Sequence, residues 1–76
     1  MSANPHLTHR EQEVVAFLIV GKTNREIAAE LNVRLPTVKA HLRSIYRKLG
    51  VSNRTEAASV GLRIFPLLRV WRVRTP

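Results

Sequence analysis

The sequence predicts an all-α domain, a bundle of four short helices that contains a helix-turn-helix. Apolar residues recur at helical spacing in four segments, and residues that favour helix termini bound these segments. No hairpin signal such as Asn-Gly joins two alternating segments, so nothing in the sequence predicts a β-sheet. A chain of 76 residues has room for one such domain.

The composition is strongly basic and excludes several classes of site. Lysine and arginine number 13 against 5 acids, which gives a net charge of +8, and 45% of the residues are hydrophobic. The chain has no cysteine, which excludes a disulfide framework and a thiolate metal site, and no aspartate to accept a phosphoryl group. The longest apolar run, residues 14–20, is far shorter than the roughly 20 residues that span a bilayer.

These exclusions define the partner to expect. A domain this small buries little surface and has no room for a deep ligand pocket, and no motif places a nucleophile beside a base. We therefore expect a soluble, cytoplasmic protein that is not an enzyme. It should need no cofactor, metal or small-molecule ligand and bind no membrane. The partner that its charge favours is a polyanion.

The first two expected helices each open with a capping box, in which a threonine hydroxyl and a glutamate three residues later cap each other's backbone N–H. Thr8 opens a helix over about 9–20, and Gly21 suits its left-handed end. Thr23 opens a shorter helix over about 24–31.

The third helix follows after a turn at residues 32–34, which are too few for another element. Pro36 fits a first helical turn, because its missing N–H has no partner to lose there. We expect this helix over about 36–49, with Gly50 ending it. Two helices joined by so tight a turn are a helix-turn-helix.

The fourth helix is expected over about 54–65. Asn53 and Glu56 form a third cap pattern before it, and Pro66 stops it. The chain then divides into one helical domain over 1–66 and a basic and apolar tail over 67–76.

The third helix has one apolar side and one basic side when drawn at about 100° per residue. The apolar stripe consists of Val38, Leu42, Ile45 and Leu49, and the opposite side consists of Lys39, Ala40, Arg43 and Arg47. The DNA major groove, about 12 Å wide, admits one helix, and lysine and arginine can donate to guanine O6 and N7. The sequence therefore predicts that this helix enters the major groove of double-stranded DNA.

Four stretches of sequence are typical of a known family in residues and in spacing. They are residues 7–15 (LTHREQEVV), 21–28 (GKTNREIA), 37–42 (TVKAHL) and 48–57 (KLGVSNRTEA). Together they resemble the LuxR/FixJ/GerE type of DNA-binding domain over about residues 7–65. The resemblance implies the fold of the LuxR C-terminal effector domain, with the third helix as recognition helix and the fourth as dimer contact.

The resemblance also assigns roles to residues. It implies base contacts at Lys39, Ala40 and Arg43, and contacts near the DNA backbone at Lys22, Thr23, Asn24, Thr37, His41 and Lys48. Because they are positively charged, Arg34 and Arg47 are also predicted to contact the DNA backbone. For each side chain the alternative is plain solvation, and Lys48 has the further alternative of stabilising the C-terminal end of its helix.

Arg34 departs from the family pattern, which usually has a serine there as the N-cap of the recognition helix. Arginine cannot cap in that way, and a lost cap typically costs about 1 kcal/mol. We expect Arg34 to gain a phosphate contact instead.

The fourth helix is apolar over an arc of about 200°, which is wider than packing on its own core requires. A two-fold dimer is the simplest closed assembly that would bury the remaining apolar surface of this helix. The predicted interface consists of Ala57, Val60, Gly61 and Ile64. The alternative is that the tail covers this surface. RNA polymerase is a further candidate partner.

Three other functions compete with this one. A promoter-binding sigma-factor region 4 shares the Glu26-Ile27-Ala28 pattern but lacks the entry to the fourth helix seen here. RNA binding fits the charge, but the A-form major groove excludes a helix. A protein- or membrane-interaction module would act through the tail around Trp71.

Overall fold

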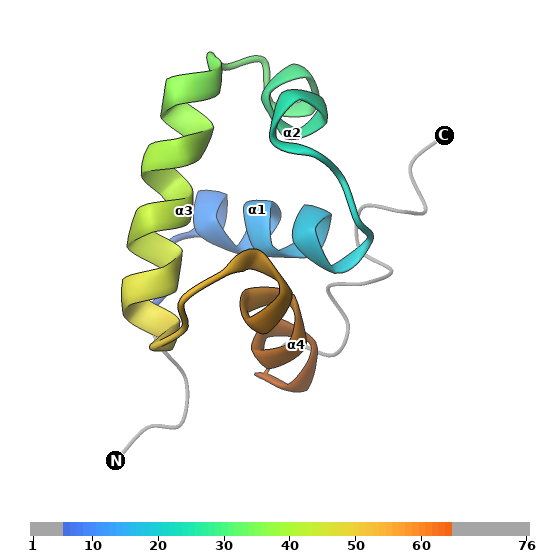
Figure 1. The fold of residues 1–76 in the computed structure, drawn as a ribbon. Helices are drawn as coiled ribbons and strands as arrows, with labels where there is room; N and C mark the ends of the chain where they lie inside the picture. The colour runs from blue at the N-terminus through green and yellow to red at the C-terminus, as the bar shows by residue number, and fades with distance from the viewer. Residues whose placement is uncertain (1–5, 65–76) are drawn as a thin grey trace.

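The computed structural model describes residues 6–64, and this part of the chain forms four helices (Figure 1). They are α1 (His9–Ile19), α2 (Asn24–Leu31), α3 (Leu35–Leu49) and α4 (Arg54–Ile64). No strand occurs within residues 6–64, so the all-α prediction is confirmed there. The expected end at Pro66 and the tail over 67–76 lie outside the described residues. None of the four helices is long and apolar enough to cross a membrane.

The two predicted capping boxes at α1 and α2 are both present. Thr8 Oγ1 accepts from the Glu11 N–H at 3.0 Å, and Glu11 Oε1 accepts from the Thr8 N–H at 2.9 Å. Thr23 and Glu26 repeat the pair at 3.1 and 2.8 Å. These bonds satisfy backbone N–H groups that a helix start leaves unpaired, which is why the two helices begin where the sequence predicts.

Left-handed residues follow three of the helices, and two of them, Gly21 and Gly50, were expected at helix ends. Gly21 has φ +86°, Asn32 has φ +56° and Gly50 has φ +70°. The short α2–α3 turn depends on Asn32, because asparagine tolerates this conformation better than most residues. The next N–H, of Val33, donates to the Ala28 carbonyl at 3.0 Å and closes the end of α2.

The starts of α3 and α4 differ in detail from the capping-box pattern. Arg34 is the N-cap of α3 and makes no side-chain cap hydrogen bond, as its chemistry predicts. Before α4, Asn53 Oδ1 accepts from the Glu56 N–H at 2.9 Å. Glu56 does not return the bond to Asn53, because its carboxylate accepts from the Ser52 N–H at 2.8 Å instead.

The core lies where α1 meets the other helices. In Figure 1, α1 crosses the middle of the domain, with α2 above it, α4 below it and α3 upright along one side. The largest completely buried side chains come from three helices: Val14, Val15, Ile27, Val38 and Ile45. On α3, Val38, Leu42 and Ile45 are buried, which confirms most of the predicted stripe; Leu49 is half-buried and packs against the core.

α4 packs closely against α1 at Gly61. A β-carbon at Gly61 would lie 2.5 Å from Val15 Cγ1, far inside van der Waals contact. Ala57, one turn earlier, is completely buried. Both residues were expected to contact a second subunit, but they lie on the inner side of α4 and face the domain's own core. Of the predicted interface, only Val60 and Ile64 keep part of their surface exposed.

A buried carboxylate joins the start of α1 to the end of α3. The Glu11 side chain is 6% exposed, and its Oε1 lies 2.8 Å from Lys48 Nζ. Its Oε2 accepts from the Ser44 hydroxyl at 2.7 Å. Burial alone raises the pKa of Glu11, but the hydrogen bonds from Lys48, Ser44 and the Thr8 N–H, with the charge of Lys48, outweigh it and lower the pKa from 4.5 to about 2.

Candidate nucleic-acid interface

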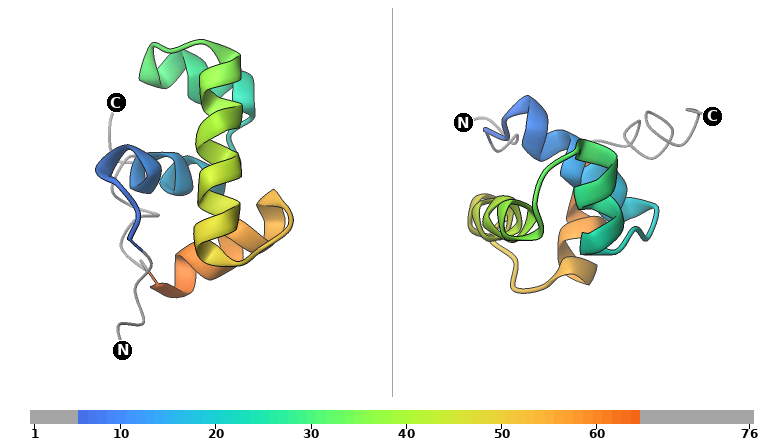
Figure 2. Two further views of the ribbon diagram at one scale, coloured as in Figure 1. Left: turned by 90° about the vertical axis from the view of Figure 1, so that its left-hand side faces the viewer. Right: turned by 90° about the horizontal axis from the view of Figure 1, so that it is seen from above.

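One face of α3 is turned away from the rest of the domain. In the left view of Figure 2, α3 lies in front of the other helices, and no described helix covers it. Lys39, Ala40, Arg43 and Arg47 are all exposed on this face. The predicted opposition of a buried apolar stripe and an exposed basic side is therefore confirmed.

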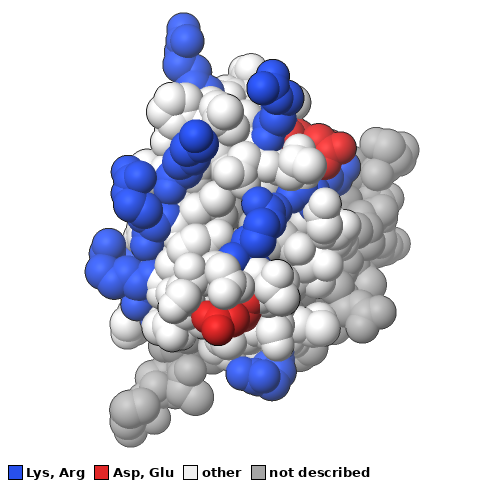
Figure 3. Space-filling model, viewed as in Figure 1, with Lys and Arg blue, Asp and Glu red and all other residues white. Residues whose placement is uncertain are grey.

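The cations of this face are not neutralised by the domain. Within residues 6–64, no carboxylate lies within 4.0 Å of Lys39, Arg43 or Arg47. The acids are engaged elsewhere: Glu11 and Glu13 on α1, Glu26 and Glu30 on α2, and Glu56 at the start of α4. Figure 3 shows the result, with blue side chains over α3 and red atoms away from it. An unopposed positive surface of this kind attracts a polyanion.

The flanks of this face differ from one another. Thr37 is exposed and His41 is half-buried, so both can reach a ligand that lies against α3. Lys48 is engaged already, because its ammonium group donates to Glu11 and to the His6 carbonyl at 3.0 Å. Its predicted DNA contact stays a prediction, and a phosphate there would have to share the ammonium group with Glu11.

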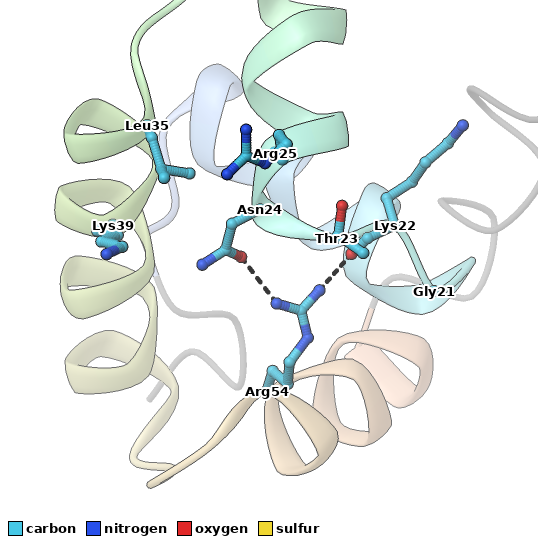
Figure 4. Close-up of a pocket in the computed structure, with 8 residues that line it drawn as sticks. All are labelled: Gly21, Lys22, Thr23, Asn24, Arg25, Leu35, Lys39 and Arg54. Atoms are coloured by element: carbon cyan, nitrogen blue, oxygen red, sulfur yellow. Dashed lines mark hydrogen bonds between the residues drawn. The ribbon is translucent and has the colours of Figure 1, made fainter.

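A groove beside α3 brings together residues from four parts of the chain (Figure 4). It is lined by Gly21, Lys22, Thr23, Asn24, Arg25, Leu35, Lys39 and Arg54 and encloses about 480 Å³. Three of the predicted backbone-contact residues, Lys22, Thr23 and Asn24, therefore lie next to α3. No acid lines the groove, so it extends the positive surface of α3 toward α2.

Arg54 connects two sides of this groove by hydrogen bonds. No role was predicted for it from the sequence. Its guanidinium donates to Asn24 Oδ1 at 2.8 Å and to the Lys22 carbonyl (Figure 4). It thereby ties the start of α4 to the loop before α2. Arg25, exposed on the first turn of α2, was missed as well. The sequence does not reveal the contacts of Arg54, since only the tertiary fold brings the start of α4 beside the loop before α2.

Lys22 points out of the groove rather than into it. Figure 4 shows its side chain extending away from Asn24 and Arg54, and its ammonium lies 3.7 Å from Glu30 Oε2. Both partners are well exposed, so the pair is weak and leaves Lys22 able to turn toward a phosphate.

Arg34→Ser tests the expectation that Arg34 lacks the N-cap bond of α3 but contacts a DNA phosphate instead. Serine supplies the missing N-cap, so the free energy of unfolding should rise by about 1 kcal/mol. DNA affinity should fall at the same time, because an exposed cation at the start of α3 is lost. Chemical denaturation and titration with duplex DNA measure the two effects. Unchanged or tighter DNA binding by the variant would refute the phosphate contact.

The four helices and the exposed basic face of α3 are those of a helix-turn-helix DNA-binding domain. The model of the bacterial regulatory proteins of the luxR family, GerE, matches residues 5–60. The chain belongs to this family, which favours the LuxR interpretation over a sigma-factor region.

Relatives and solved structures agree with this assignment. The chain is 49% identical over 59 residues to the transcriptional regulatory protein LiaR of Bacillus subtilis (strain 168), a match that covers 75% of this chain and 28% of LiaR. The response regulator ChrA of a heme-sensing two-component system superposes with a TM-score of 0.74 at 42% identity, covering 82% of this chain and 31% of ChrA. VqmA of Vibrio cholerae, solved with ligand and DNA, superposes with a TM-score of 0.75 at 28% identity, covering 91% of this chain and 33% of VqmA. The chain thus spans between 28% and 35% of the length of these proteins.

Proposed function

We propose that this domain binds a specific double-stranded DNA site as a two-fold dimer, with α3 of each subunit in the major groove. The observation that supports this most is the outer face of α3, where exposed cations flank the small residue Ala40. Lys39 and Arg43 donate to guanine edges, and Ala40 allows close approach and contacts a thymine methyl.

The groove next to α3 supplies the sequence-independent part of the binding energy. Thr23 and Asn24 at the start of α2, with Lys22 before them, contact the DNA backbone there, and Arg25 and Arg54 add charge. Arg34, Thr37, His41, Arg47 and Lys48 contact phosphates along α3. Phosphate contacts fix the position of the domain on the duplex, whereas base contacts choose the sequence. Each phosphate neutralised makes log K fall by about 0.9 per decade of salt.

Dimerisation is supported by the kind of regulator that the chain resembles. VqmA, of the fold described above, has been solved as a dimer in the absence of its target DNA and, in another structure, in a complex with ligand and DNA. Val60 and Ile64 on α4 retain exposed apolar surface for such a contact. Selecting bound sequences from a random duplex pool tests the whole proposal, because a two-fold dimer should yield a two-fold symmetric consensus.

Arg43→Ala and Lys22→Ala should have different effects on DNA binding. Loss of Arg43 should cost roughly 1–3 kcal/mol on the selected site and reduce discrimination against other sequences there. Loss of Lys22 should weaken binding to all sequences alike and lower the salt slope by about 1. Titrations of both variants with the selected site and with random duplex, at several salt concentrations, measure this difference. Equal weakening of both duplexes by Arg43→Ala would contradict the base contact.

A further inference from the structure

Arg54, the first residue of α4, makes its hydrogen bonds with the segment that opens α2. Its guanidinium donates from Nη1 to Asn24 Oδ1 at 2.8 Å and from Nη2 to the Lys22 carbonyl. Within residues 6–64, no carboxylate lies within 4.0 Å of Arg54. Both acceptors are neutral, so these bonds hold the segment in place without cancelling the charge of the arginine.

These bonds determine which end of the Asn24 amide faces the groove. An asparagine amide has an acceptor oxygen and a donor NH2 group, and it can present either one by turning over. A guanidinium only donates, so it must bind the oxygen, which leaves the NH2 group on the other side. Figure 4 shows this arrangement, with the oxygen on the dashed line to Arg54 and the amide nitrogen on the side of α3.

The NH2 group of Asn24 is available to a ligand. Within residues 6–64, no group accepts a hydrogen bond from it, and no buried side-chain polar atom is left without a partner, so this group reaches the solvent of the groove. Lys39 lines the same groove from α3, and no acid lines it. A phosphate oxygen accepts hydrogen bonds and carries negative charge, so it suits an NH2 group in positive surroundings.

We propose that Arg54 is a positioning residue for DNA binding, which fixes the Asn24 amide so that its NH2 group donates to a backbone phosphate in this groove. The proposal rests on the DNA-binding function given above and adds a role to the charge that Arg54 supplies. An amide that is already held in its bound orientation loses little freedom on binding, so preorganisation strengthens the contact. The role depends on the planar fork of arginine, which reaches two acceptors at once and which lysine lacks.

Arg54→Lys tests the proposal with the charge retained. We expect binding to a random-sequence duplex to weaken by about tenfold, the effect of losing one hydrogen bond to a charged group. The weakening should be the same at low and high salt, because a neutral amide releases no counterion. Arg63→Lys is the matched control, since it makes the same change at an exposed arginine in the last turn of α4 and should bind as the wild type does. Titrations with fluorescent duplex at several salt concentrations measure these affinities.

A double-mutant cycle shows whether Arg54 acts through Asn24. Asn24→Ala should weaken binding about as much as Arg54→Lys, and the double variant should bind little more weakly than either single one. A purely structural role would lower the unfolding temperature of Arg54→Lys but leave its effect on DNA affinity independent of Asn24. Additive losses in the double variant would therefore refute the proposal. Wild-type affinity of Arg54→Lys would also refute it, because Arg54 would then supply charge alone.

Asn24→Asp tests the same contact in a variant that keeps the bond to Arg54. Its carboxylate still accepts from the guanidinium, and an acid in the first turn of a helix is favourable, so the unfolding temperature should not fall. The variant has no NH2 group and adds a negative charge, so DNA binding should weaken by more than tenfold. Wild-type affinity of Asn24→Asp would overturn the proposal. Failure of the unmodified chain to bind either random or selected duplex would overturn the proposed function as well, whereas the results above concern the role of Arg54 alone.

Discussion

Glu11→Ala should lower the free energy of unfolding by about 3 kcal/mol. The substitution removes the acceptor of three hydrogen bonds, from Lys48, Ser44 and the Thr8 N–H. It also deletes one half of the capping box that starts α1. The side chain of Lys48 is 27% exposed, so its ammonium can regain water, which keeps the cost at the lower end of the range for broken buried pairs. Chemical denaturation at neutral pH measures the loss.

The same carboxylate predicts how stability depends on pH. The pKa of Glu11 is lowered in the folded domain to about 2 from 4.5. A lowered pKa means that the unfolded chain binds the proton more tightly, so the stabilisation is complete above about pH 5 and is lost as the pH falls toward 2. The shift corresponds to about 3 kcal/mol, in line with the expected cost of Glu11→Ala.

Glu11→Gln isolates this contribution. The amide keeps an acceptor for the Thr8 N–H but cannot ionise, so the variant should lose less stability than the wild type between pH 5 and pH 2. Glu30→Gln is the matched control, because its 3.7 Å pair with Lys22 is exposed and should contribute little. Parallel acid titrations of Glu11→Gln and the wild type would contradict the assignment. A double-mutant cycle with Lys48→Met gives the coupling energy of the pair directly.

Gly61→Val should destabilise the domain by about 3 kcal/mol, the upper end of the cost of overpacking. A β-carbon at this position meets Val15 Cγ1 at 2.5 Å, and Val15 is completely buried, so its side chain has no free space to move into. The β-branched valine at position 15 also has few rotamers that would relieve the contact. Denaturation of the variant, with the wild type as reference, measures the effect.

Gly61→Ala in two backgrounds shows whether the contact is the cause. Alanine favours helix over glycine by about 1 kcal/mol, but in the wild-type background the clash should outweigh that gain. In the Val15→Ala background the clashing methyl is gone, and Gly61→Ala should become neutral or stabilising. If Gly61→Ala stabilised the wild-type chain, then α1 and α4 would not be packed as closely as the structure has them.

The helices and their limits could be predicted because the forces that start and end a helix are local. The bonds of Thr8 with Glu11, and of Thr23 with Glu26, join residues three apart, and a left-handed residue needs only its own backbone. The two faces of α3 followed from the helical period alone. For the same reason the exposure of Lys39 and Arg43 was predicted correctly, whereas their contacts with DNA bases stay predictions.

What the sequence determined by itself is therefore the four helices and the opposition of core and cations on α3. Tertiary structure alone decided which residues from different helices meet. In the folded domain Arg54 donates to Asn24, and Lys48 pairs with Glu11. Gly61 and Ala57 are buried on the side of α4 that faces the core. The physical reason is range: helix periodicity and capping act within a turn or two of the chain. A helix wheel shows which residues of α4 share a side, but which side the core covers depends on how the whole bundle packs.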